Sequence, residues 1–190
     1  KQATQAVLER FLADGRFRDE APAAEDDGLA AYAPPAVRDR LAARAKSDPV
    51  AWAGALLAQA GPGDYFALLA YLRRTPAVHE RLQRLRLAAR AYTHVATTLG
   101  YGPRFLHSTG QLHKGGPATG VFLQLTADEG DEVAIPGEPY GFGALRRAQA
   151  AGDFEVLARR GRRVVRIHLG AAIERGLDAL VEGLGAAVRT

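Results

Sequence analysis

Tyr65 to Leu72 reads YFALLAYL, a short continuous apolar run between Gly61-Pro-Gly63 and Arg73-Arg-Thr-Pro76. Such a run between turn residues is typical of a strand that is buried on both faces of a sheet. Three further segments of strand character follow, separated by helical stretches: 93–99 (THVATTL), 120–126 (GVFLQLT) and 164–169 (VVRIHL). Because parallel strands need a crossover that is usually a helix, this alternation predicts an α/β fold with a parallel sheet covered on both faces.

The expected helices lie on either side of this run. After it we expect a helix that begins at Thr75-Pro76, a short helix near Ser108, a helix over 142–159 with a break at Gly152-Asp153, and a closing helix over 171–188. Ahead of it we expect helices over 1–14, over 35–46, and from Asp48-Pro49 to Gly61, whereas 16–33 has no periodicity and is expected to form a long surface excursion. The pattern predicts a helical lead-in over residues 1–61 and an α/β domain over residues 62–190.

The composition narrows the function classes. The 190 residues include no Cys, which excludes disulfides and Cys-ligated zinc and favours a cytoplasmic location. No apolar run approaches the ~18 residues of a membrane span, so we expect no membrane association. The net charge is +4, and the one dense basic cluster lies between residues 159 and 166. We interpret that cluster as a solvated loop and expect no nucleic-acid partner.

The richest polar stretch, residues 100–117, reads GYGPRFLHSTGQLHKGGP and begins at the carboxyl end of a predicted strand, where α/β sheets bind ligands. Its glycines and hydroxyls suit a phosphate, its histidines can move protons, and its Lys can hold an anion. A phosphate-bearing small-molecule site and a purely structural turn therefore remain alternatives. His107 and His113 do not share a helical face and have no acid nearby, so we expect no metal. Of the other histidines, His168 ends the last predicted strand and is either background or part of a cleft.

Two long segments carry a resemblance to a known family. YGPRFLHSTGQLHKGGPATGVFLQLT (101–126) and IPGEPYGFGALRRAQAAGDFEVLARRGRRVVRIHLG (135–170) resemble the isomerase half of bifunctional transaldolase/glucose-6-phosphate isomerase proteins. The element His107-Ser-Thr-Gly-Gln111 also resembles the HSxGQ element in the second sugar-isomerase (SIS) domain of short phosphoglucose isomerases. The resemblance covers residues 50 to 170 and implies a three-layer SIS-like, Rossmann-like domain.

The implied activity is the cofactor-free interconversion of glucose 6-phosphate and fructose 6-phosphate by proton transfer through a cis-enediol. A proton donor and acceptor must open the sugar ring, and a general base must carry a proton between C2 and C1. The resemblance implies that His113 opens the ring, with His107 as the alternative. It also implies that Lys114 interacts with the anionic group of the substrate. The implied substrate contacts are Ser108, Thr109, Gly110 and Gln111.

Two departures from the family pattern leave the general base unidentified. The glutamate loop that precedes the HSxGQ element is missing, and Glu80, the nearest upstream acid, follows a helical pattern. The late family lysine also has no counterpart, because the matching turn over 140–144 is followed by Arg146 and Arg147.

We also expect the chain to be part of a longer protein, because it begins at Lys1 and contains no Met. Phosphoglucose isomerases place their active site between two SIS domains, with help from a neighbouring subunit. The resemblance therefore implies an absent upstream domain, a homo-oligomer and an inactive isolated chain. A transaldolase barrel of ~250 residues does not fit in this chain. The alternative is a non-catalytic SIS-like domain that binds a sugar phosphate as a sensor or structural module.

Overall fold

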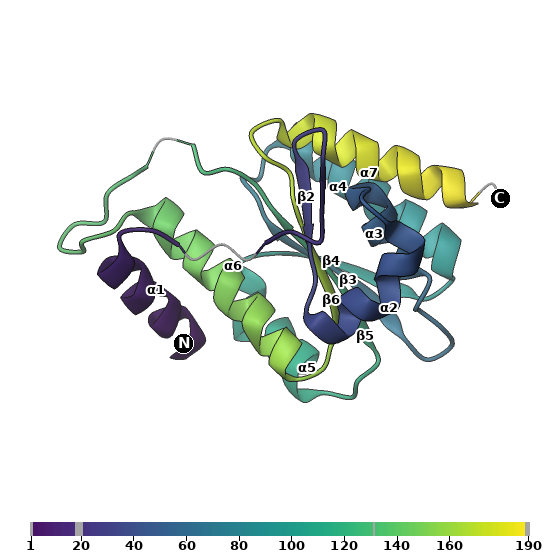
Figure 1. The fold of residues 1–190 in the computed structure, drawn as a ribbon, viewed down its shortest axis with the longest axis horizontal. Coiled ribbons are helices and arrows are strands. Elements are labelled where there is room, and N and C mark those ends of the chain that lie inside the picture. Colours follow the sequence, from purple (N-terminus) through teal and green to yellow (C-terminus); the bar gives the residue numbers. More distant parts are fainter. Residues whose placement is uncertain (1, 18–20, 131, 189–190) are drawn as a thin grey trace.

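The computed structural model describes residues 2–17, 21–130 and 132–188, and these form a three-layer α/β structure (Figure 1). Its sheet has the strand order β1-β2-β6-β5-β3-β4. The four parallel strands are β3 (Tyr65–Tyr71), β4 (Ala96–Tyr101), β5 (Gly120–Thr126) and β6 (Arg163–His168). This confirms the predicted α/β class with a largely parallel sheet and a helical start.

Helices cover both faces of the sheet. One face carries α2 (Pro35–Ala45), α3 (Pro49–Leu57), α4 (Pro76–Thr93) and α7 (Ile173–Val188). The other carries the 3₁₀ turn η1 (Arg104–His107), α5 (Thr109–Gly115) and α6 (Phe142–Arg159). Helix α1 (Gln2–Asp14) packs on the outside of α6, so α1 and α6 lie together on one side of the sheet in Figure 1. None of the helices described in the structure is long and apolar enough to cross a membrane.

The alternation of side chains along β3 explains its unbroken apolar sequence. Phe66 and Leu68 face the core beneath α3, α4 and α7, whereas Ala67 and Leu69 face the core beneath α5 and α6. All four are at most 1% exposed. A central parallel strand buries both faces in this way, so it needs apolar residues at successive positions.

The segment expected to be a surface excursion contains a β-hairpin instead. Strands β1 (Ala24–Asp26) and β2 (Leu29–Tyr32) are joined by Asp27-Gly28, and both turn residues have positive φ, at 47° and 77°. Asp-Gly is a strong signal for a two-residue hairpin turn, and the prediction of a surface excursion over residues 16–33 overlooked it. β2 pairs antiparallel with β6 and buries Ala31 completely. The expected excursion also included residues 18–20, which lie outside the described residues.

The hairpin, α2 and α3 belong to the same core as the parallel strands. Ala31 of β2, Leu41 of α2 and Trp52 of α3 are buried in one cluster with Leu123 and Ile167. The described part of residues 1–61 is therefore continuous in packing with the rest of the chain.

Several predicted boundaries were wrong. The helix expected to end at Gly61 ends at Leu57, and two further differences have local reasons. The strand expected from Thr93 begins at Ala96, because α4 continues through Thr93 and ends at His94 in the left-handed conformation. Helix α6 is continuous through Gly152, where a break was expected. A Cβ at Gly152 would lie 2.9 Å from the backbone nitrogen of Thr4, so this glycine allows the close approach of α1.

Candidate functional site

The polar stretch over residues 100–117 begins at the end of β4, as the sequence predicts, but its helix start does not face a cleft among the described residues. β4 ends at Tyr101, η1 follows, and α5 begins at Thr109 directly after Ser108. The segment thus starts at the carboxyl end of β4 and runs back across the α6 face of the sheet. Helix α5 has only seven residues and ends at Gly115.

Residues 107–111, which we call the exposed segment, present their polar groups to solvent. His107, Ser108, Thr109 and Gln111 are all exposed, and the Ser108 side chain does not cap α5. The amide of Gln111 donates a hydrogen bond of 3.4 Å to the His107 carbonyl oxygen. Gly110 is buried, and a Cβ there would lie 3.1 Å from the Phe105 carbonyl oxygen. Four of the predicted substrate and proton-transfer residues therefore lie on one short stretch of surface.

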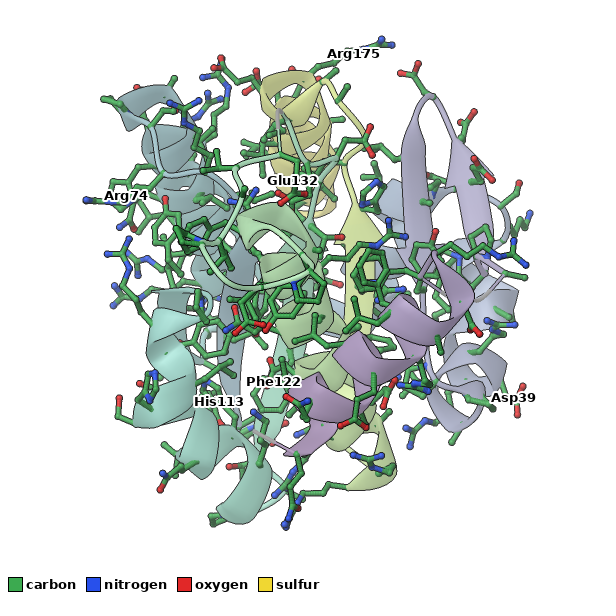
Figure 2. The ribbon with its side chains drawn as sticks, turned by 90° about the vertical axis from the view of Figure 1, so that its left-hand side faces the viewer. Asp39, Arg74, His113, Phe122, Glu132 and Arg175 are labelled. Atoms are coloured by element: carbon green, nitrogen blue, oxygen red, sulfur yellow. The ribbon has the colours of Figure 1, made fainter. Side chains whose placement is uncertain are left out.

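His113, by contrast, is part of the core. Its side chain points inward, the residue is 3% exposed, and its Nδ1 lies 2.8 Å from the Tyr65 hydroxyl. The His113 ring packs edge-on against Phe122 with 5.0 Å between ring centroids, and the two residues lie together in Figure 2. Burial, helped by the charge of Lys114, lowers the pKa of His113 to about 4. The imidazole is consequently neutral at physiological pH.

Lys114 is also held by the protein itself. Its ammonium group forms an ion pair with Asp153 of α6, whose carboxylate is almost fully buried. Burial raises the pKa of Asp153, although Lys114 opposes that shift. The carbonyl oxygens of Lys114 and Gly116 each accept a hydrogen bond from Arg162, at 2.9 Å and 2.6 Å. These contacts fasten α5 to α6 and to the start of β6.

A separate cleft of about 940 Å³ opens at the carboxyl ends of β5 and β6, between the sheet, α1 and α6. It is lined by Tyr71, Thr126 and His168 from strand ends, by Asp128 and Glu129 from the loop after β5, and by side chains of α1 and α6. No residue of the exposed segment lines it, and neither do His113 and Lys114.

His168 joins a hydroxyl and a carboxylate in this cleft. Its Nδ1 lies 3.1 Å from the Thr126 hydroxyl, and its Nε2 lies 3.0 Å from Asp128 Oδ1. The His168 side chain is 32% exposed and that of Asp128 is 58% exposed. This arrangement can pass protons, because the imidazole has an oxygen partner at each nitrogen. Of the two interpretations of His168, the structure supports the one that places it in a cleft.

The cleft also holds several arginines in fixed positions. Arg146 donates to both oxygens of Glu129, and Arg10 forms an ion pair of 2.7 Å with Glu155. The guanidinium of Arg166 lies over the ring of Tyr32 at 4.3 Å, and that of Arg147 lies over Phe17 at 4.6 Å. Among the described residues that line the cleft, four arginines face three carboxylates.

Sequence reasoning missed Thr126, Asp128, Glu129 and Arg146. The rule that ligands bind at the carboxyl ends of parallel strands was applied to the second predicted strand, but it holds equally for the ends of 120–126 and 164–169. Within the described residues, no cluster of three or more His, Asp or Glu side chains is arranged to hold a metal ion.

Comparison with known proteins bears on the fold. No protein family matches the chain, and no curated protein is significantly similar to it in sequence. The chain is similar to the crystal structure of a hypothetical protein from Thermus thermophilus, with a TM-score of 0.62 and 17% sequence identity. The similarity covers 80% of this chain and 41% of the Thermus protein, so the chain spans less than half of that protein's length. At this identity the similarity supports the three-layer α/β fold alone.

Proposed function

We propose that this chain is the SIS-like domain of an aldose–ketose isomerase that interconverts glucose 6-phosphate and fructose 6-phosphate. The observation that carries the proposal is the exposed segment. It presents an imidazole, two hydroxyls and a carboxamide next to one another on the surface, between the end of β4 and the first turn of α5. A phosphorylated sugar can use all four groups as hydrogen-bonding partners.

The burial of each residue then decides which of the roles implied by the resemblance it can take. His107 is exposed and takes the ring-opening role, because proton transfer requires contact with the substrate. Ser108, Thr109 and Gln111 bind hydroxyl and phosphoryl oxygens of the substrate. His113 and Lys114 act indirectly by holding α5 in place, since both are engaged inside the protein.

The outward direction of the exposed segment favours an active site that is completed from outside this chain. An upstream SIS domain or a second subunit would cover the substrate and supply the general base for the carbon-bound proton. If a second subunit completes the site, the protein is a homo-oligomer. The proposal also implies a cytoplasmic enzyme, because both sugar phosphates are cytoplasmic metabolites.

The test is isomerase activity of this chain and of a longer protein that contains it. Fructose 6-phosphate is the substrate, and glucose 6-phosphate is measured with glucose-6-phosphate dehydrogenase and NADP⁺. We expect turnover from the longer protein, no turnover from the chain alone, and a loss of about 10²-fold or more in the longer protein with His107→Asn. The matched control is His94→Asn, which changes the histidine at the end of α4, beside the amino ends of the strands.

A non-catalytic sugar-phosphate sensor is the second candidate. It is favoured by the internal contacts of His113 and Lys114, which remove two of the three implied catalytic side chains from direct contact with substrate. Binding of fructose 6-phosphate by the longer protein, measured by calorimetry, without any turnover would support the sensor and contradict the isomerase.

A further inference from the structure

We propose that Thr126, His168 and Asp128 form a proton relay that moves protons between oxygen atoms of a sugar phosphate bound in the cleft. The relay lies apart from the exposed segment and contains none of the residues that the resemblance implies. The inference rests on the proposed function only for the identity of the ligand.

The backbone sets the geometry of the relay. Thr126 and His168 are direct partners in the parallel register of β5 and β6. Just beyond the strands, the Leu169 amide donates to the Thr126 carbonyl oxygen at 2.8 Å, and the Asp128 amide donates to the Gly170 carbonyl oxygen at 3.1 Å. These bonds position the backbone of the three residues, and the contacts of the Thr126 hydroxyl and the Asp128 carboxylate with the His168 ring orient their side chains.

The chemistry of the partners assigns the hydrogen-bonding roles. A carboxylate can only accept, so His168 donates its Nε2–H to Asp128, and in the tautomer with an unprotonated Nδ1 the Thr126 hydroxyl donates to Nδ1. When a ligand hydroxyl gives its proton to Thr126 Oγ1, Thr126 passes its own proton to Nδ1, and the imidazolium is stabilised by Asp128. The reverse sequence returns one proton to a second ligand oxygen. The net change is one proton moved between two oxygens, so the relay can open and close a cyclic sugar at this second site independently of the role proposed for His107.

The lining of the cleft fits a sugar phosphate. Its volume lies within the roughly 300–1,000 Å³ of small-molecule sites. Tyr32 and Phe17 provide aromatic surface beside Arg166 and Arg147, and Arg10 and Arg146 also line the cleft. Rings can pack on the C–H face of a sugar, and guanidinium groups suit phosphoryl oxygens.

The first experiment measures binding by the 190-residue chain labelled with ¹⁵N at histidine. Glucose 6-phosphate, inorganic phosphate and glucose are compared at equal concentration. We expect glucose 6-phosphate to shift the His168 imidazole signals, and its affinity to fall about tenfold or more with Thr126→Val, which removes one hydrogen-bonding group. Thr126→Ser keeps the hydroxyl and should keep the affinity, and His94→Asn should leave it unchanged. Equal shifts from inorganic phosphate and glucose 6-phosphate, or shifts at His107 with none at His168, would overturn the proposal.

The second experiment measures the relay itself. Interconversion of the α and β anomers of glucose 6-phosphate requires ring opening, and its rate is measurable by NMR exchange spectroscopy. We expect the chain to accelerate it, the acceleration to fall about tenfold or more in His168→Gln and Thr126→Val, and Thr126→Ser to restore it. Circular dichroism checks that each variant is folded.

The outcomes separate the two proposals. Anomer interconversion that depends on His168, without isomerase activity in the longer protein, would contradict the proposed function and support the relay. The relay would be overturned if the longer protein has isomerase activity and the rate of anomer interconversion is the same with and without the Thr126 hydroxyl.

Discussion

At the scale of single residues, the two histidines of the HSTGQLH sequence have opposite environments. His107 is exposed, whereas His113 lies against Phe105 and Phe122 and contacts the Tyr65 hydroxyl. They are six residues apart, which is more than one helical turn, and η1 and α5 turn them to different sides. Residue type therefore does not distinguish a histidine that can meet a substrate from one that fills the core.

The lowered pKa of His113 predicts a pH-dependent stability. The pKa falls from 6.5 in the unfolded chain to about 4 in the folded protein, so the unfolded state binds more protons between these values. The contribution of His113 to the free energy of unfolding should therefore be most favourable above pH 6.5 and become less favourable by roughly 3 kcal/mol as the pH approaches 4. Urea titrations across this range measure the fall.

A variant isolates this contribution. The glutamine of the His113→Gln variant does not titrate, so the slope of stability against pH should become shallower than in the parent chain. Identical slopes for the parent chain and His113→Gln would contradict the assignment.

At the scale of elements, the contact between α1 and α6 depends on a glycine. Gly152 lies mid-helix, where glycine costs roughly 1 kcal/mol relative to alanine. Here Ala3 and Thr4 of α1 approach it so closely that a Cβ would meet their backbone atoms at 2.9–3.2 Å. The sequence pattern predicted a break in the helix at this position, and that prediction was wrong. The glycine is needed for close packing between two helices and does not interrupt the helix.

This packing predicts opposite effects for two glycine substitutions. Gly152→Ala should lower the midpoint of thermal unfolding, because α1 must move away from α6. Gly54→Ala in α3 should raise it, since the nearest atom, in the Leu184 side chain, lies 3.9 Å from the added Cβ. The expected gain at Gly54 is about 0.5–1 kcal/mol. A gain of similar size at Gly152 would show that the close contact is absent in solution.

At the scale of the whole molecule, residues before and after position 61 share one core. Trp52 of α3 is 1% exposed and belongs to the same buried cluster as the parallel strands. We therefore expect one cooperative unfolding transition, with coincident midpoints from Trp52 fluorescence and from far-ultraviolet circular dichroism.

Core substitutions on either side of position 61 test this cooperativity. Leu56→Ala and Leu123→Ala remove fully buried side chains, and each should lower the free energy of unfolding by about 2–5 kcal/mol. Both should shift the fluorescence and the dichroism midpoints together. A transition of Trp52 that separates from the dichroism in either variant would identify residues 1–61 as an independent unit.

Local sequence was enough to predict the α/β class, because the apolar runs of β3 and β5 need burial on both faces and the stretches between them have helical periodicity. It also determined the start of α4, where Thr75 accepts a hydrogen bond from Val78 and Pro76 occupies the first turn. These features depend on neighbours along the chain. They can be predicted because local geometry and binary pattern act over a few residues.

Which polar residues come into contact depends on packing between distant parts of the chain. Thr126, Asp128 and His168 lie up to 42 residues apart, and the parallel register of β5 and β6 brings them within hydrogen-bonding distance. Lys114 and Asp153 are joined in the same way, by the packing of α5 against α6. Strand order and helix packing arise from burial summed over the whole core, so no window of sequence contains the information that places these side chains together.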